Sequence, residues 1–179
     1  MYLLALHPDQ QEQVAAEVAP LGLTPNNAAE ILPRLVHTRA VIDEVLRLYP
    51  PAFVIVRQAI GDDDNAGGVR IPKGSLVLIA PWVLHRHRRF WIAPDRFDPS
   101  RFLPDRSPPS RFAYMPFGAG PRICVGNPFA LTELVLVVAT MLRSFRVALA
   151  PHRPVAPVGI VTVQPDVPPP FRMTARVSD

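Results

Sequence analysis

The sequence FGAGPRICVG, at residues 117–126, contains the single cysteine of a 179-residue chain. Its three glycines allow backbone angles that other residues avoid, and they let the chain approach a flat surface closely. An apolar stretch starts at position 127, so Cys124 is expected just before a helix N-terminus, where partial positive charge favours a thiolate. Arg122 offers a fixed positive charge to an anionic group. This cysteine loop is therefore suited to hold a thiolate against a large planar ligand.

These residues alone leave other roles open for Cys124. An inert buried cysteine is the most common role, and a nucleophilic thiol needs a histidine that the fold could bring from elsewhere in the chain. Structural zinc needs several cysteine or histidine ligands, and none of the five histidines stands at ligand spacing to Cys124. A phosphate loop would need a lysine after its last glycine, whereas Gly120 is followed by Pro121 and Arg122.

The hydrophobic periodicity predicts one domain that is mainly α-helical with small β-sheets, an α+β fold. The expected elements are two helices within residues 8–49, a β-hairpin region over 53–79, a meander with the cysteine loop over 94–126, a buried helix over 127–146 and C-terminal strands over 147–179. Within the hairpin region, a turn at residues 72–74 separates two apolar runs, which indicates a hairpin between residues 69–71 and 76–79.

Five residues of the cysteine loop match the pattern F-x-x-G-x-R-x-C-x-G, and they are Phe117, Gly120, Arg122, Cys124 and Gly126. In this pattern the chain resembles the haem-thiolate monooxygenases of the cytochrome P-450 family. The resemblance implies the C-terminal haem-binding portion of that fold and haem b (iron protoporphyrin IX) as the cofactor. It also implies that Cys124 is the iron ligand, with Phe117 packed beside the thiolate.

Further motifs of the same family follow in the expected order. Glu44 and Arg47, in DEVLRLYPP, resemble its E-x-x-R pair, and Arg96, in PDRFDPSRF, resembles the arginine of its P-x-R-F segment. The resemblance implies a partly buried triad of Glu44, Arg47 and Arg96 that locks the meander onto the core. Breaking such a network strands a buried charge.

Three residues are expected to lie near the propionates of the haem. The resemblance implies that Arg57, in the strand after Pro50 and Pro51, binds one propionate and that Arg122 binds the other. His85, in HRHRRFW, is expected close to them.

The resemblance implies a monooxygenase that inserts one atom of O₂ into a small organic substrate. Its electrons would come from a redox protein, a ferredoxin or a flavoprotein reductase. The family's oxygen-activating helix carries an acid–threonine pair in A-G-x-[DE]-T, and none of the six threonines follows such a segment. No catalytic residue is therefore expected within these residues, and Met1 is expected to fall in the last turns of that helix. The alternatives are a haem-binding fragment or a gene remnant without independent catalysis.

The chain has a net charge of +4, and its single lysine is Lys73. The basic run HRHRR at residues 85–89 is interpreted as a solvated face, on which an acidic redox protein could also dock. No zinc-finger spacing or RNA-binding signature accompanies it, so no nucleic-acid partner is expected.

The most apolar segment, at residues 129–142, is too short to span a bilayer. One cysteine and no signal peptide predict a soluble, cytoplasmic protein.

Overall fold

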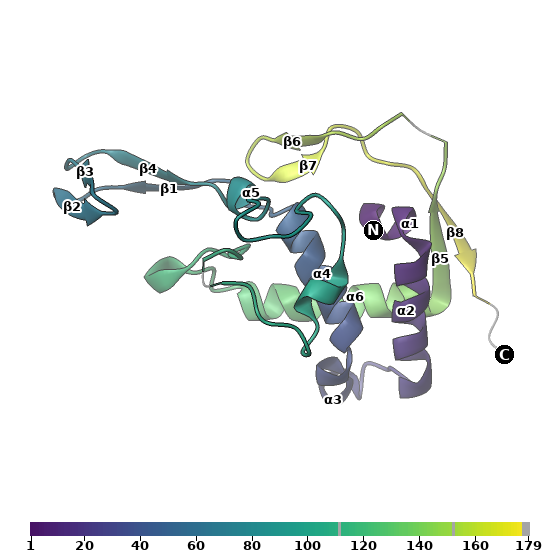
Figure 1. Cartoon of the computed structure of the whole chain (residues 1–179). Helices are drawn as coiled ribbons and strands as arrows, with labels where there is room; N and C mark the ends of the chain where they lie inside the picture. Colours follow the sequence, from purple (N-terminus) through teal and green to yellow (C-terminus); the bar gives the residue numbers. More distant parts are fainter. Residues whose placement is uncertain (111, 152, 177–179) are drawn as a thin grey trace.

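The computed structural model describes residues 1–110, 112–151 and 153–176 (Figure 1). The N-terminal part is helical, with α1 (Tyr2–Leu6), α2 (Pro8–Val18), the short α3 (Ala28–Ile31) and α4 (Val36–Leu48). Pro8 starts α2, where its missing N–H leaves no hydrogen bond unmade. The two helices predicted within residues 8–49 are present as α2 and α4. The sequence analysis did not predict α3 or the 3₁₀ turns Ala19–Leu21 and Leu32–Arg34.

The central part of the chain forms an extended β-arm, seen at the upper left of Figure 1. Strand β1 (Ile55–Gln58) pairs antiparallel with β4 (Leu76–Ile79), and β2 (Asp63–Ala66) pairs with β3 (Val69–Ile71). The predicted hairpin between residues 69–71 and 76–79 is therefore wrong. Gly67 and Gly68, both at positive φ, form the tight turn between β2 and β3 instead. Gly74 then directs the chain back onto β1, because its N–H donates to the carbonyl of Ala59.

The rest of the chain carries α5 (Pro81–Leu84), an irregular meander and α6 (Asn127–Ser144). The meander contains the 3₁₀ turn Pro99–Phe102, and the cysteine loop contains the 3₁₀ turn Gly120–Arg122. Strand β5 (Phe145–Leu149) follows α6 directly and pairs with β8 (Phe171–Ala175), while β6 (Pro157–Gly159) and β7 (Val163–Pro165) form a hairpin. Of the predicted C-terminal strand region, residues 152 and 177–179 lie outside the described residues.

The apolar core lies where α2 and α4 cross α6 (Figure 1). Each of the three helices contributes a face, with buried side chains that include Val14, Val18, Val41, Leu46, Val135, Ala139 and Leu142. The prediction of a buried helix at residues 127–146 is confirmed for only one face of α6. Phe129, Leu134 and Val137 are exposed on the same helix. An apolar pattern identifies α6 as a helix, but it does not tell which faces are covered.

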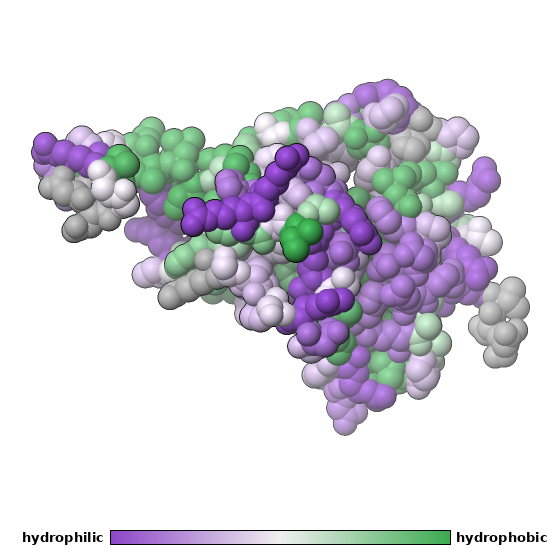
Figure 2. All heavy atoms as spheres, in the orientation of Figure 1, coloured by the Kyte–Doolittle hydropathy of each residue, from purple (hydrophilic) through white to green (hydrophobic). Residues whose placement is uncertain are grey.

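The β-arm also exposes apolar side chains. Val56, Leu76 and Leu78 are exposed, and Val56 lies opposite Leu78 in the register of β1 and β4. Figure 2 shows a green, hydrophobic area along the arm. Large exposed apolar areas commonly mark interaction surfaces.

Gln11 joins three separate parts of the fold through one buried amide. Its Nε2 donates to the carbonyls of Leu4 (2.7 Å) and Val147 (2.7 Å), and its Oε1 accepts from the N–H of Val147 (2.9 Å). The amide therefore ties α2 to the end of α1 and to β5. The sequence analysis did not single out Gln11, because its partners in β5 are distant in the chain.

We expect Gln11→Leu to lower the free energy of unfolding by about 3 kcal/mol, because leucine leaves buried backbone groups of Leu4 and Val147 without partners. Urea unfolding followed by circular dichroism measures the change. Gln13→Leu, at an exposed position of the same helix, is the control and should change stability by less than ~0.5 kcal/mol. Equal effects of the two substitutions would contradict the role assigned to Gln11.

Candidate functional site

Backbone hydrogen bonds fix the shape of the cysteine loop, residues 117–126. The N–H of Cys124 donates to the carbonyl of Phe117 (2.9 Å), and the carbonyl of Cys124 accepts from the N–H of Asn127 (3.2 Å), the first residue of α6. Gly118 and Gly120 adopt φ values of 78° and 74°, which glycine tolerates without strain. The loop therefore closes on itself at Cys124 and leads directly into the helix.

The sulfur of Cys124 is presented to solvent within an apolar surface. Cys124 is exposed, as are Ile123 (50%), Val125 (98%) and Phe129 (73%). A β-carbon added to Gly126 would lie 3.8 Å from the sulfur, so glycine keeps that side of the thiol open. The 18-residue helix α6 starts three positions after Cys124. An exposed thiol among exposed apolar side chains is suited to bind a large apolar ligand that has an atom the sulfur can coordinate.

Strand β1 lies against the loop. The side chain of Ile55 is 3.7 Å from where a β-carbon on Gly118 would be. Arg57 is two residues further along the same strand, so its side chain is on the same face as that of Ile55. Both Arg57 and Arg122 are exposed, and the Arg57 guanidinium donates only to the neighbouring carbonyl of Val56 (2.9 Å) among the hydrogen bonds of the described residues. Arg122 in the cysteine loop and Arg57 on the strand beside it are thus two exposed cations that could bind anionic groups.

Glu44 and Arg47 form a fully buried ion pair on α4. The guanidinium donates to both carboxylate oxygens, with distances of 2.7 Å (Nε to Oε2) and 2.8 Å (Nη2 to Oε1), and both side chains have 0% exposure. The remaining N–H groups of Arg47 donate to the carbonyls of His85 (2.7 Å), Pro94 (2.6 Å) and Arg96 (3.1 Å). All five guanidinium donors are thus used, and α4 holds the meander through backbone carbonyls.

The third member of the network differs from the sequence prediction. Arg101 lies against Glu44, with its Nε 3.5 Å from Oε1, and its side chain is 14% exposed. The Arg96 side chain is exposed, and this residue contributes only its carbonyl. PDRFDPSRF contains the P-x-R-F spacing twice, at residues 94–97 and 99–102. The 3₁₀ turn Pro99–Phe102 turns the second arginine inward, and spacing alone cannot reveal that direction.

We therefore expect replacement of the two arginines to change stability by different amounts. Arg101→Ala should lower the free energy of unfolding by about 1–3 kcal/mol, because it removes a largely buried partner of Glu44. Arg96→Ala should change it by less than ~0.5 kcal/mol, because the carbonyl remains. Chemical denaturation of both variants under one set of conditions measures the two losses in free energy of unfolding. A larger loss for Arg96→Ala than for Arg101→Ala would indicate that Arg96 is the third member of the triad.

His85 is not free to bind an anionic ligand as the sequence analysis expected. Its ring is fully buried, with Nδ1 3.1 Å from the carbonyl oxygen of Arg47, and its Nε2 accepts from the N–H of Met115 (2.9 Å). Since Nε2 is an acceptor, Nδ1 carries the proton and donates to Arg47. Burial, with the nearby cations of Arg47 and Arg86, lowers the pKa of His85 to about 4. The residue is therefore a neutral, structural histidine.

This lowered pKa predicts an acid-sensitive fold. Between pH 6.5 and about 4, His85 takes up a proton in the unfolded chain and not in the folded one, so stability falls as the pH falls. The loss is complete below pH about 4 and is on the order of 3 kcal/mol. The free energy of unfolding is measured from pH 7 to pH 4 for the wild type and for His85→Gln. Comparison of the two isolates the contribution of His85. From pH 7 to pH 4 the stability of the wild type relative to His85→Gln should fall by about 3 kcal/mol, and a constant difference would contradict the assignment.

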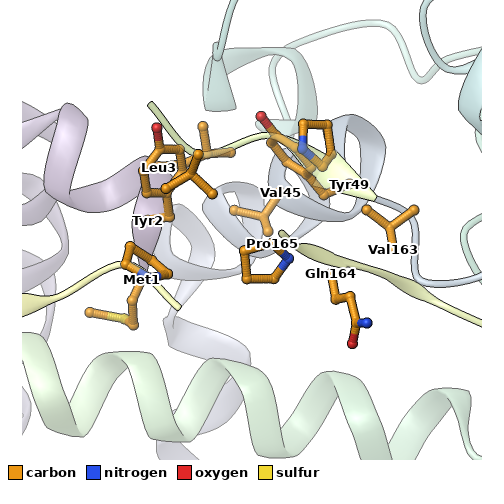
Figure 3. A pocket seen from close by; sticks show the side chains of 11 residues that line it. Met1, Tyr2, Leu3, Val45, Tyr49, Val163, Gln164 and Pro165 are labelled. Atoms are coloured by element: carbon orange, nitrogen blue, oxygen red, sulfur yellow. The ribbon is translucent and has the colours of Figure 1, made fainter. Parts of the chain in front are cut away.

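A separate hollow lies between α1, α4 and the β6–β7 hairpin (Figure 3). Its volume is about 190 Å³, and its lining includes Leu3, Val45, Tyr49 and Val163. No residue of the cysteine loop lines this hollow, so it is not the space in front of Cys124. Within the described ranges, no group of three or more histidine, cysteine, aspartate or glutamate side chains could hold a metal ion.

Comparison with known proteins identifies the family. A sequence profile described as "Cytochrome P450" matches residues 1–166. The chain belongs to the cytochrome P450 family. Membership implies haem as the cofactor, and Cys124 lies within the matched residues.

Relatives and solved structures of this P450 chain agree on fold and extent. It is 39% identical over 178 residues to pentalenene oxygenase of Streptomyces avermitilis, covering 98% of this chain and 39% of the relative. It is 38% identical over 159 residues to cyclooctatin synthase of Streptomyces melanosporofaciens, covering 87% and 34%. The solved structure of a retinoic acid-bound cyanobacterial P450, CYP120A1, superposes with a TM-score of 0.89 at 32% identity, covering 98% of this chain and 40% of that one.

The P450 chain thus spans 34–40% of the length of these three proteins. The predicted class, mainly α with small β-sheets as a partial P450 fold, is confirmed. In the part that the structure describes, no helix combines the length and the apolarity needed to cross a bilayer.

Proposed function

We propose that this chain carries the thiolate side of a haem-dependent monooxygenase, with Cys124 as the axial ligand of haem b. The supporting observation is the exposed sulfur of Cys124, held by the Phe117 carbonyl at the start of α6 and surrounded by exposed apolar side chains. The residues around Cys124 fit a haem group. A thiol faces outward, Gly126 leaves room beside it, and Ile123, Val125 and Phe129 offer an apolar surface for a porphyrin.

Each residue then has a definite task. Cys124 would hold the iron through its sulfur and donate electron density to it. Arg57 and Arg122 bind the propionates, because guanidinium groups pair with carboxylates through two parallel hydrogen bonds. Phe117 and Gly120 complete the loop around the thiolate. Haem, when bound, supplies the iron centre for oxygen activation, and electron donation from a cysteine thiolate favours O–O cleavage.

The overall reaction consumes one O₂, two electrons and two protons for each molecule of organic substrate. One oxygen atom enters a C–H bond of the substrate to give an alcohol, and the other leaves as water. A redox protein, a ferredoxin or a flavoprotein reductase, supplies the electrons. Pentalenene is the first substrate to test, because pentalenene oxygenase is among the relatives of the chain.

A second candidate function is haem binding without turnover. It is supported by the absence of an Ala-Gly-x-acid-Thr segment from the sequence. Under this alternative, Cys124 would hold the iron, but no acid–threonine pair of this sequence would supply protons for oxygen activation.

The two candidates are separated by one assay. The chain is supplied with haemin, the organic test substrate, NAD(P)H, a ferredoxin–reductase pair and isotopically labelled O₂. The products are analysed by mass spectrometry. Label in an organic product that is absent with Cys124→Ala supports the monooxygenase. Haem ligation through sulfur without labelled product supports the binding function, and failure to bind haem contradicts both.

A further inference from the structure

His85 lies where three segments of the chain meet. It follows α5, its Nδ1 donates to the Arg47 carbonyl at the end of α4, and its Nε2 accepts from the N–H of Met115. Its side chain is completely buried. The imidazole therefore bridges the buried ion-pair helix and the segment that leads into the cysteine loop.

A second attachment stands beside the first. The hydroxyl of Tyr114 lies 2.9 Å from the Asp43 carboxylate and 3.1 Å from the Asp43 carbonyl, both on α4. The rings of Tyr114 and His85 are 5.4 Å apart. Residues 114 and 115 are thus held to α4 at two adjacent points, one of which depends on His85.

The hydrogen bonds continue from Met115 to the thiol. The carbonyl of Met115 accepts from the N–H of Gly118 (3.0 Å), and the carbonyl of Phe117 accepts from the N–H of Cys124 (2.9 Å). The position of Met115 therefore sets where Phe117 stands, and Phe117 sets the backbone of Cys124. We propose that His85 is a positioning residue that fixes the cysteine loop relative to α4. The iron-related part of this inference rests on the proposed function.

Histidine suits this position for a chemical reason. A neutral imidazole donates through one nitrogen and accepts through the other across a rigid ring, whereas lysine and arginine only donate. Burial, and then the nearby cations of Arg47 and Arg86, lowers the pKa of His85 and so disfavours a second proton on the ring. Nε2 is the ring nitrogen that accepts from Met115, in the segment before the loop. Glutamine can place an amide oxygen close to the position of Nε2.

The first test needs no haem. Amide hydrogen exchange of residues 113–126 is measured by mass spectrometry in the unliganded chain under native conditions. In His85→Leu, which lacks the acceptor, exchange there should be about tenfold faster, as expected for one lost buried hydrogen bond. His85→Gln should stay within about threefold of the wild type. Gln11→Leu is the matched control, because it removes a buried polar side chain whose hydrogen bonds reach Leu4 and Val147 and no residue of the loop. It lowers the global stability, but exchange of this segment through local opening should be unchanged.

The outcomes decide the inference. Unchanged exchange in His85→Leu overturns it, and so does an equal increase in Gln11→Leu. Should His85→Leu not fold, His85→Gln against wild type carries the test, with retained protection supporting the inference and a tenfold loss contradicting it.

The second test uses haem-loaded protein. The fraction of thiolate-ligated iron in the reduced, CO-bound spectrum should fall in His85→Leu and recover in His85→Gln, with Gln11→Leu matching the wild type. If the wild type does not bind iron through sulfur, the proposed function fails, whereas the exchange measurement still decides the role of His85.

Discussion

Replacing Glu44 with alanine is expected to destabilise the fold by roughly 3–5 kcal/mol, because it leaves the guanidinium of Arg47 buried without its counter-charge. Both side chains are fully buried, and Glu44 also accepts from the N–H of Asp98 (2.8 Å) and lies beside Arg101. One carboxylate thus supports α4 and the meander together. A loss of this size is a large fraction of the stability of a typical domain.

Denaturant unfolding at neutral pH measures this effect. The control is Glu133→Ala, which removes the same side chain from an exposed position of a helix, α6, and should change stability by less than ~0.5 kcal/mol. A loss below ~1 kcal/mol for Glu44→Ala would show that the ion pair does not hold the meander.

Replacing Cys124 with alanine is expected to abolish thiolate ligation while leaving the fold intact. The side chain is exposed, and its backbone hydrogen bonds to Phe117 and Asn127 do not need the sulfur. Circular dichroism and thermal unfolding should therefore match the wild type, whereas haemin affinity should fall at least about tenfold through loss of the iron–sulfur bond.

Absorbance titration with haemin measures the affinity of each protein. Met173→Ala, at an exposed sulfur-containing residue of β8, is the control and should bind haemin as the wild type does. Equal haemin affinity and identical spectra for Cys124→Ala and the wild type would place the iron ligand elsewhere.

The sequence predicted the features that depend on local pattern. The helices at α2, α4 and α6 follow from apolar periodicity and proline positions, and the pairing of Glu44 with Arg47 follows from their separation of three residues on one helix. The sequence motif around Cys124 was sufficient for the family, which the comparison with known proteins confirms.

What the sequence did not reveal depends on side-chain direction and on distant partners. Two P-x-R-F segments are equivalent as patterns, and only the 3₁₀ turn at Pro99–Phe102 brings Arg101 to Glu44. The roles of His85 and Gln11 depend on partners more than twenty residues away along the chain. A buried polar side chain is recognised by its hydrogen bonds, which require the fold.

The exposed face of α6 has a related explanation. Phe129, Leu134 and Val137 gave the apolar pattern from which a buried helix was predicted, yet α2 and α4 cover only the opposite face. The chain aligns with about 40% of the length of its structural relatives. Burial predicted from pattern assumes that every apolar face meets a partner within the same set of residues.

The thiolate assignment is tested most directly by the spectrum of the chain supplied with haemin, reduced and exposed to CO. We expect the long-wavelength Soret band of a thiolate-ligated haem, and we expect it to be absent from Cys124→Ala. A spectrum typical of histidine ligation, or no haem uptake at all, would contradict the assignment of Cys124 as the iron ligand.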